Sequence, residues 1–268
     1  MCNTFGFIGA GNMGGSLAKA AAKAMDPQLI TLADQCAEKA SALAASLGCA
    51  TADTNTVATN CNVIFLGVKP QVMAAMLGSI APILAARTDR FVLVSMAAGI
   101  SMADIRKMAG GDYPVIRIMP NIPVSVGGGM ILYDCTENVS EDTIRLFLGS
   151  MSYAGRLDRL PEKLIDAGSA LSGCGPAFVA LFTEALADGA VACGLPREQA
   201  LTYAAQTLAG TAKMLLESGQ HPGALKDAVC SPGGSTIAGV TALEQGAFRA
   251  SVMDAVSCAY NRTLELGK

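Results

Sequence analysis

Two glycine-bearing loops carry the residues of this sequence that are best suited to holding an anion. The first reads Gly9-Ala10-Gly11-Asn12-Met13-Gly14, and the second reads Ser231-Pro232-Gly233-Gly234-Ser235-Thr236. Each precedes a segment with helical character, and the first turn of a helix offers unbonded N–H groups with a partial positive charge. Glycines leave these groups accessible, so both loops predict backbone anion sites, with plain connectors as the alternative.

The first loop has the Gly-x-Gly-x-x-Gly spacing of dinucleotide-binding folds, after a predicted strand and before a predicted helix. In such folds the first glycine permits a tight turn, the second lets the backbone approach a pyrophosphate, and the third lets helix and strand pack closely. The sequence therefore predicts a nicotinamide dinucleotide held by the loop residues Gly9, Ala10, Gly11, Asn12, Met13 and Gly14.

Asp34 stands where these folds place the acidic residue that binds the adenosine ribose, about 20 residues beyond the loop. A 2′-phosphate is repelled by such a carboxylate and prefers an arginine, whereas Gln35 follows here. The pair predicts that NADH is used at least as well as NADPH. Alternatively, Asp34 merely caps the helix expected from Ala37.

Three more loops follow predicted strands and combine proline with small residues. They read Val68-Lys69-Pro70, Met96-Ala97-Ala98-Gly99 and Met119-Pro120-Asn121. Ligands of open α/β sheets bind beyond the carboxyl ends of the strands, so these loops predict the floor of a nicotinamide site. Simple strand termination is the alternative for each loop.

Metal and nucleophilic chemistry have little support in the composition. The chain has one histidine, His221, and nine cysteines without a Cys-x-x-Cys pair. An odd cysteine count indicates free thiols in a reducing compartment, so we expect a cytoplasmic protein without a metal site. His221 precedes a proline and is interpreted as a turn residue rather than a general base.

Charge and hydropathy exclude two classes of partner. The net charge is −3, and no basic cluster forms the footprint that nucleic acid requires. The first residues lack the basic segment of a secretory signal, and the uncharged stretch 70–86 is shorter than the ~20 apolar residues that cross a bilayer. We therefore expect neither nucleic acid nor membrane as a partner.

The elements that must position these loops follow from the apolar runs. Short apolar runs alternate with alanine-rich helical segments in the first half, which predicts a doubly wound, mostly parallel sheet of Rossmann type. We expect helices near 13–25, 37–47 and 70–84. Strands are expected at Thr4–Ile8, Leu29–Ala33, Val63–Val68, Phe91–Ser95, Val115–Ile118 and Gly129–Tyr133.

The pattern becomes wholly helical from about Arg159. Apolar residues then recur at helical spacing, as in 201–215, and Gly173, Gly175 and Pro176 are expected to break a helix. The sequence therefore predicts two domains, a dinucleotide-binding domain over residues 1–158 and an all-α domain over residues 159–268. The small, apolar character of the second favours burial against a partner subunit, with a monomeric helical bundle as the alternative.

Six segments along nearly the whole chain resemble those of pyrroline-5-carboxylate reductases, the enzymes of the last step of proline biosynthesis. They read FIGAGNMG, FLGVKPQ, MPNIP, LSGCGPAFV, LADGAVACGLP and QHPGALKDAVCSPGGSTIAG. Residues 225–244 are the specific part, because the N-terminal loop alone fits many dehydrogenases. The resemblance implies reduction of the cyclic imine of 1-pyrroline-5-carboxylate to L-proline by NADPH or NADH.

The resemblance also implies roles for individual residues and an assembly. Substrate would be bound by Ser231, Gly234, Ser235 and Thr236, with Thr236 near the ring nitrogen as the catalytic residue. The cofactor would lie beside Val68, Lys69, Pro70 and Ala97, with Asn121 in the adjoining loop. The C-terminal domain would form homodimers, which in the family commonly assemble to decamers.

This sequence departs from the family pattern in three places. Cys174 and Phe178 replace residues with hydroxyls, and Gly219 replaces an acidic residue that often precedes the QHP run. Many members have Asn-Arg where this chain has Asp34-Gln35, which argues against a preference for NADPH.

Three other functions fit parts of the sequence. A broader cyclic-imine reductase shares the same loops. A β-hydroxyacid dehydrogenase shares the domain plan but needs a lysine that LSGCGPAFVALFTEA lacks. A regulatory dinucleotide-binding module would need no second anion loop.

Overall fold

Short runs of β-branched and aromatic residues form one sheet in the computed structural model, which describes residues 3–266. The runs that form the middle of the sheet are buried on both faces, as expected for strands covered by helices. The strands are β1 (Phe5–Ile8), β2 (Ile30–Ala33), β3 (Ala50–Thr51), β4 (Val63–Leu66), β5 (Val92–Ser95), β6 (Val115–Met119), β7 (Gly129–Cys135) and β8 (Gly155–Arg159).

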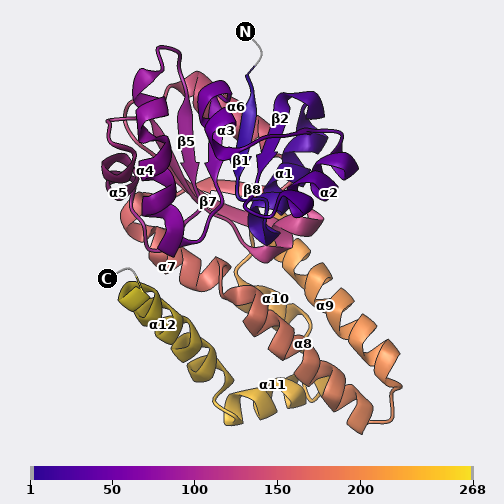
Figure 1. The fold of residues 1–268 in the computed structure, drawn as a ribbon. Helices are drawn as coiled ribbons and strands as arrows, with labels where there is room; N and C mark the ends of the chain where they lie inside the picture. Colours follow the sequence, from indigo (N-terminus) through magenta and orange to yellow (C-terminus); the bar gives the residue numbers. More distant parts are fainter. Residues whose placement is uncertain (1–2, 267–268) are drawn as a thin grey trace. The chain divides into compact units, whose positions relative to one another are not determined.

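The strand order in the described residues is β3-β2-β1-β4-β5-β6-β7-β8 (Figure 1). Strands β1 to β6 pair in parallel, β7 runs antiparallel to β6, and β8 is parallel to β7. The chain leaves β1 for β2 and β3, and then continues with β4 on the other side of β1. Since ligands of such sheets bind where the order reverses, the carboxyl ends of β1 and β4 mark the expected site.

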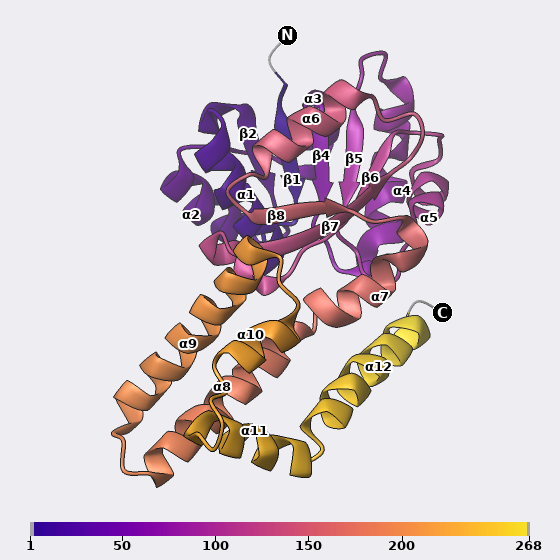
Figure 2. The ribbon, with the colours of Figure 1, turned by 180° about the vertical axis from the view of Figure 1, so that it is seen from behind.

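Helices cover both faces of this sheet. Phe5 and Phe7 of β1 cluster with side chains of α1, α2 and α6, whereas Ile8 clusters with α3, α4 and α5. Figure 2 shows α6 lying across the sheet on the face seen from behind. The helices are α1 (Asn12–Ala24), α2 (Ala37–Leu47), α3 (Thr54–Asn60), α4 (Pro70–Ala86), α5 (Met102–Ala109) and α6 (Glu141–Ser150), with short 3₁₀ turns η1 (Pro27–Leu29) and η2 (Ile122–Val126).

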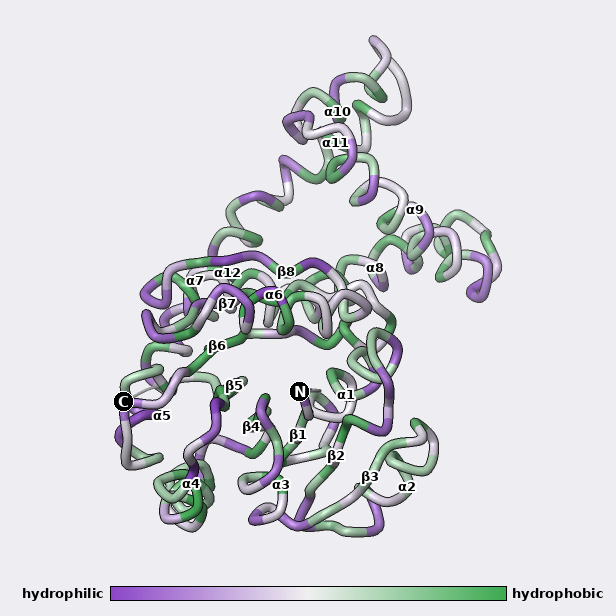
Figure 3. Tube along the Cα trace, turned by 90° about the horizontal axis from the view of Figure 1, so that it is seen from above, coloured by the Kyte–Doolittle hydropathy of each residue, from purple (hydrophilic) through white to green (hydrophobic). Residues whose placement is uncertain are grey.

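The predicted Rossmann-type α/β class is confirmed, and all six expected strands are present to within two residues. Two strands and three helices of this part are not among the predicted elements: β3, β8, α3, α5 and α6. Strand β8 reads Gly-Arg-Leu-Asp-Arg and lies at the sheet edge, and Figure 3 shows it far more hydrophilic than β6. Short, polar edge strands lack the continuous apolar run that identifies a buried strand.

The chain divides into two compact units that differ in their packing. Within the described residues, the first unit comprises residues 3–174, which include α7 (Glu162–Ser172), together with residues 259–266, and the second comprises residues 175–258. The sequence pattern places the domain boundary between residues 158 and 159 and so assigns α7 to the helical domain. That boundary stays a prediction. Gly173 and Gly175 do separate α7 from the next helix, as expected.

The second unit is helical and buries few of its apolar side chains within the single chain. Its small core is formed by Ala187, Ala200 and Ala204, where α8 packs on α9, and Arg197 pairs there with Asp188. Many large apolar residues are exposed, including Leu181, Leu216 and Met253. The helices are α8 (Gly175–Ala192), α9 (Arg197–Ser218), α10 (Pro222–Ala228), α11 (Ser235–Gln245) and α12 (Phe248–Leu266), which ends beyond the unit.

Candidate functional site

The first glycine loop connects β1 to α1 at the reversal point of the sheet. Gly9 has φ +101°, and a β-carbon there would lie 2.6 Å from the carbonyl carbon of Gly67. A β-carbon on Gly67 would in turn meet the Gly9 carbonyl oxygen, and one on Gly14 would collide with that same oxygen. Gly9 and Gly14 thus serve the tight turn and the close helix packing that their spacing predicts, and Gly67 is a partner that sequence reasoning passed over.

Gly11 is different because no atom lies within 4 Å of the position that its β-carbon would take. It caps α1 without a side-chain hydrogen bond, and the first turn holds no acidic residue. The N–H groups of Asn12, Met13 and Gly14 make no hydrogen bond within the described residues. This open, positively polarised helix start fits a pyrophosphate.

Asp34 anchors this loop from the end of β2. Its Oδ2 accepts the Ala10 N–H at 2.8 Å, and its Oδ1 accepts the Cys36 N–H at 2.9 Å. It does not cap α2, whose N-cap is Cys36 without a side-chain bond, so the simpler alternative raised above is wrong. Each oxygen keeps a second lone pair, so Asp34 can both shape the loop and accept a ribose hydroxyl.

A cavity of about 670 Å³ opens in front of the loop. Four of the predicted cofactor residues line it: Ala10, Gly11, Asn12 and Met13. Sequence reasoning missed the rest of its wall, Gly15, Ser16, Lys19, Lys39, Ala42, Leu43, Ile122 and Ser125. Ser16 and Lys19 follow Asn12 at helical spacing on α1, which is the signal that could have found them.

The other predicted cofactor residues lie at strand ends of the first unit, outside that cavity wall. Pro70 is the first residue of α4, whose N-cap, the exposed Lys69, makes no side-chain cap bond. Ala97 is buried, with its N–H directed at the Ser95 hydroxyl. Asn121 is buried, and both groups of its side-chain amide bond to the protein, which fixes the orientation of this side chain.

The second glycine loop precedes α11 in the second unit. Gly233 has φ +68°, and a β-carbon on Gly234 would collide with Ser231 Oγ. Gly234 caps α11 without a side-chain bond, and its N–H donates to the Ser231 carbonyl at 3.0 Å. Within the part of the chain that the structure describes, the N–H groups of Ser235 and Thr236 stay unbonded, as do both hydroxyls. The loop is therefore a second open helix start.

His221 and three of the cysteines have surroundings that suit a structural role. His221 caps α10, where its Nδ1 accepts the Gly223 N–H at 3.0 Å, so the prediction of a turn histidine is confirmed. Burial raises the pKa of the Cys61 thiol, and of the Cys49 and Cys135 thiols, above its usual range. Raised pKa values keep these sulfurs protonated and poorly nucleophilic.

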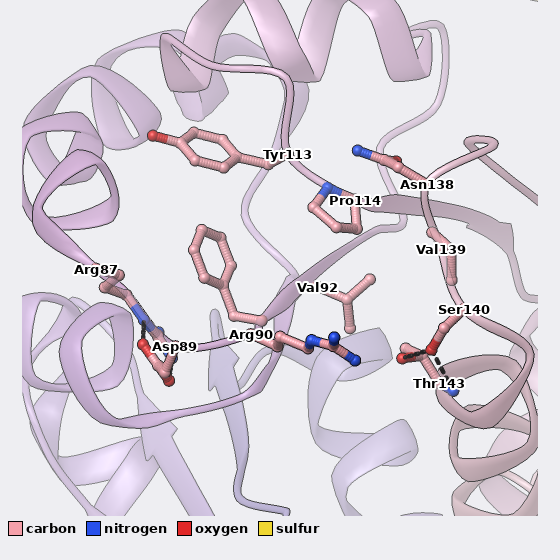
Figure 4. A pocket seen from close by; sticks show the side chains of 11 residues that line it. Arg87, Asp89, Arg90, Val92, Tyr113, Pro114, Asn138, Val139, Ser140 and Thr143 are labelled. Atoms are coloured by element: carbon pink, nitrogen blue, oxygen red, sulfur yellow. Dashed lines mark hydrogen bonds and ion pairs between the residues drawn. The ribbon is translucent and has the colours of Figure 1, made fainter.

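A cavity of about 570 Å³ lies at the opposite edge of the sheet, where β5 and β6 begin. Figure 4 shows Arg90 pointing toward Ser140 and Thr143 at the start of α6. That helix start is already capped by Ser140, and its first turn is acidic. Arg87 is engaged by Asp89. The polar groups of this cavity are therefore largely satisfied by the protein itself.

Two family models match the two parts of the chain. Residues 4–99 match the model described as NADP oxidoreductase coenzyme F420-dependent. Residues 162–266 match the model described as pyrroline-5-carboxylate reductase dimerisation. The first covers the open glycine loop before α1, and the second covers the open loop before α11.

Full-length relatives show the same likeness. The chain is 39% identical to pyrroline-5-carboxylate reductase 3 of Macaca fascicularis, over 98% of this chain and 96% of the relative. A solved pyrroline-5-carboxylate reductase from Coxiella burnetii superposes with a TM-score of 0.91 at 32% identity, covering 99% of both chains. The Plasmodium falciparum pyrroline carboxylate reductase, solved with NADP bound, gives 0.87 at 30% identity, covering 99% of this chain and 98% of that one.

Proposed function

This chain belongs to the pyrroline-5-carboxylate reductase family, and from that premise we propose that its two open helix starts serve one reaction, one for the cofactor and one for the substrate. The protein is an NAD(P)H-dependent oxidoreductase that reduces the C=N bond of 1-pyrroline-5-carboxylate, which gives L-proline. The observation that carries the proposal is that α1 and α11 both begin without a side-chain cap behind glycines that leave N–H groups free.

The cofactor assignment is supported by the fit of the first loop. When bound, NAD(P)H supplies the hydride that the imine carbon accepts. The free N–H groups of Asn12, Met13 and Gly14 hold the pyrophosphate at the positive end of α1, and Gly11 gives it room. Lys69, Pro70 and Ala97 border the nicotinamide, and Asp34 fixes the loop.

The substrate assignment is supported by the fit of the second loop to a small carboxylate. The N–H groups of Ser235 and Thr236 and the Ser231 hydroxyl are unbonded donors in one turn, suited to a carboxylate. Thr236 Oγ1 hydrogen-bonds the ring nitrogen. A protonated imine is already electrophilic, so positioning contributes more to the rate than proton transfer does.

The direct test is oxidation of NADH and NADPH with pyrroline-5-carboxylate, alongside cyclic imines that lack the carboxylate. We expect turnover with pyrroline-5-carboxylate and at least a tenfold lower kcat/KM without its carboxylate, since charged hydrogen bonds contribute about 1.5–3 kcal/mol. Equal rates for all imines would instead favour a broader imine reductase. Cofactor binding without imine-dependent oxidation would favour a regulatory module.

Cofactor preference provides a second test, which concerns Asp34. We expect kcat/KM with NADH to equal or exceed that with NADPH, because the carboxylate repels a 2′-phosphate. Asp34→Asn should weaken binding of both cofactors about tenfold, since an amide oxygen replaces only one of two accepted N–H bonds. It should also shift the ratio toward NADPH. Titration by nicotinamide fluorescence measures both effects.

The matched control for that titration is Asp53→Asn, because Asp53 caps α3 away from the loop. It should leave both dissociation constants unchanged. A large NADPH preference of the wild type would contradict the repulsion of a 2′-phosphate by Asp34. The anchoring of the first loop by Asp34 would still be tested by the cofactor affinity of Asp34→Asn.

The exposed apolar surface of the second unit bears on assembly. The match of residues 162–266 to a dimerisation model supports oligomerisation, and we propose a homodimer, assembling further to a decamer, in the cytoplasm. Residues Glu162–Ala192, which include α7 and α8, are together long and apolar enough to cross a bilayer by length and composition, and only 11% of their most apolar window is buried in the single chain. A partner subunit gives this surface a cover without a membrane.

Light scattering of the purified protein should therefore give at least twice the chain mass of 27.3 kDa. The mass should stay constant on tenfold dilution, because obligate interfaces are large and apolar. Flotation with anionic vesicles should leave the protein at the bottom of the gradient. A monomer, or co-migration with the vesicles, would overturn this assignment of the apolar face.

A further inference from the structure

Two lysines in the wall of the 670 Å³ cavity have no role in the proposed reaction. Lys19 lies on α1 and Lys39 on α2, and both residues, called the cavity lysines below, are exposed. Within residues 3–266 the ion pairs that lysines form all lie in the second unit, so no carboxylate there neutralises the cavity lysines. The wall itself contains no acidic residue. The cavity is therefore positively charged, although the net charge of the chain is −3.

The arrangement of α1 and α2 directs both lysines toward one edge of the sheet. Helix α1 follows β1 and α2 follows β2, and these strands pair in parallel, so both helices begin at the carboxyl ends of the strands. Figures 1 and 2 both show the two helices side by side. Since helical side chains lean toward the first turn of their helix, both lysines lean toward the edge that carries the first glycine loop and Asp34.

A pyrophosphate at the start of α1 does not account for these charges. The unbonded N–H groups of residues 12–14 already provide its donors. Lys19 stands seven residues beyond Asn12, which is about 10 Å along the helix axis. Lys39 is on the neighbouring helix, five residues after Asp34. The cavity thus extends from the first glycine loop along the groove between two helices, and its cations lie beyond the helix start.

Asp34 indicates which part of a dinucleotide faces Lys39. In this fold the acidic residue after the second strand binds the adenosine ribose. Asp34 also accepts the N–H of Ala10, which lines the cavity, at 2.8 Å. NADPH differs from NADH by a phosphate on the 2′-oxygen of that ribose. Such a phosphate adjoins the first turn of α2, whose third residue is Lys39.

The donors of the cavity wall suit a phosphate monoester. Such a group carries a charge of about −1.5 to −2 at neutral pH, which two ammonium groups match. Lysine binds phosphate as a point charge, so the fork of an arginine is not required. The side-chain amide of Asn12 makes no hydrogen bond within the described residues and supplies a further donor. The Ser16 hydroxyl instead donates to the Asn12 carbonyl at 2.7 Å.

We propose that Lys19 and Lys39 bind the 2′-phosphate of NADPH and so set how well NADPH is used beside NADH. This inference rests on the proposed function, whose cofactor site it extends. Repulsion of the 2′-phosphate by Asp34 and its attraction by the cavity lysines oppose each other, so the protein uses both cofactors. The lysines thereby supply the positive charge that Gln35, in place of an arginine, does not.

The first test measures binding without turnover, by calorimetry with adenosine 2′,5′-bisphosphate and with 5′-AMP. It compares the wild type with the double variant Lys19→Met and Lys39→Met, in which methionine keeps most of the aliphatic chain. The dissociation constant of the bisphosphate should rise at least about tenfold, the effect of one lost hydrogen bond to a charged group. That of 5′-AMP, which has no 2′-phosphate, should stay within about threefold. Both positions are exposed, so the melting temperature should be retained.

The second test is the ratio of kcat/KM for the two cofactors with pyrroline-5-carboxylate. The double variant should lose at least about tenfold with NADPH and less than about threefold with NADH. Lys39→Arg keeps the charge and should retain its use of NADPH. The matched control is Lys23→Met, which removes an exposed charge from α1 outside the cavity wall and should change neither value.

A combined variant tests the opposition between Asp34 and the cavity lysines. The shift toward NADPH that is expected for Asp34→Asn should disappear when both lysines are also replaced, because the shift depends on the attraction that they provide. An undiminished shift in the triple variant would contradict the proposal.

Two results of the binding and kinetic tests would overturn the assignment. Equal losses for NADH and NADPH would show that the lysines attract the dinucleotide as a whole, and unchanged affinity for the bisphosphate would show that they bind no phosphate. If the double variant does not fold, Lys39→Met alone decides by the same comparison. A wild type inactive toward pyrroline-5-carboxylate refutes the proposed function, whereas the calorimetry still tests the lysines.

Discussion

Gly11→Val should abolish cofactor binding while leaving the fold intact. The backbone of Gly11 has φ −68° and ψ −165°, which valine adopts readily, and open space surrounds the position of its β-carbon. The valine would fill the space expected for the pyrophosphate and block its hydrogen bonds to the start of α1. Losing two charged hydrogen bonds should raise the dissociation constant at least about 100-fold.

Two further glycine variants make this result specific. Gly149→Val places valine at an exposed, open glycine of α6 and should leave cofactor binding unchanged. Gly14→Ala forces a β-carbon onto the Gly9 carbonyl oxygen and should lower the melting temperature as well as cofactor affinity. Calorimetry of binding and thermal denaturation measure both properties. Normal cofactor affinity in Gly11→Val would refute the placement of the pyrophosphate.

Thr236→Val should lower kcat/KM for pyrroline-5-carboxylate by about 10- to 100-fold, the range expected for one hydrogen bond to a charged group. Valine keeps the shape of threonine, and the Thr236 hydroxyl makes no bond within the described residues whose loss would disturb the fold. Cofactor affinity should be unchanged because the first loop is untouched. Steady-state kinetics with saturating cofactor measure the effect.

Thr241→Val is the matched control. It lies on the same helix, but its hydroxyl donates to the Ile237 carbonyl at 2.9 Å and is not at the helix start. This variant should retain kcat/KM within about twofold, as for a surface substitution away from the site. Equal kinetics of the two variants would remove Thr236 from the mechanism and leave the carboxylate to the backbone.

The strands of the parallel sheet could be predicted because their apolar runs are continuous, as in β4 and β5. Strand β8 and helix α5 could not be predicted in the same way. Strand β8 takes its place from pairing with β7, and α5 is a short helix whose capping box, Ser101 with Asp104, identifies it only when capping is examined. Elements fixed by tertiary pairing or by caps escape a search for apolar periodicity.

Glycine spacing predicted the geometry of the first loop well because its constraint is local. The conformation of Gly9 and the packing of Gly14 follow from the turn itself. Hydrogen-bond and ion-pair partners that are distant in sequence could not be predicted from such a local pattern. The amide of Asn121 bonds to Ser172 and Met130, and the pairing of Arg117 with Asp166 spans 49 residues. A motif shows which residues stand together in the sequence. It does not show which of their side chains already bond to other parts of the protein.

The uncapped starts of α1 and α11 also have a consequence for the lifetime of the protein. A serine or aspartate cap stabilises a helix by roughly a few tenths of a kcal/mol relative to glycine, and both helices have glycine at this position. Ligands that bind only the folded chain supply what is missing, so the empty enzyme unfolds more readily than the loaded one. The rate at which the cell degrades this protein would then depend on the fraction of it that is bound to ligand. A capping side chain engineered at either position should raise the stability of the free protein and lower its activity, because cap and ligand compete for the same N–H groups.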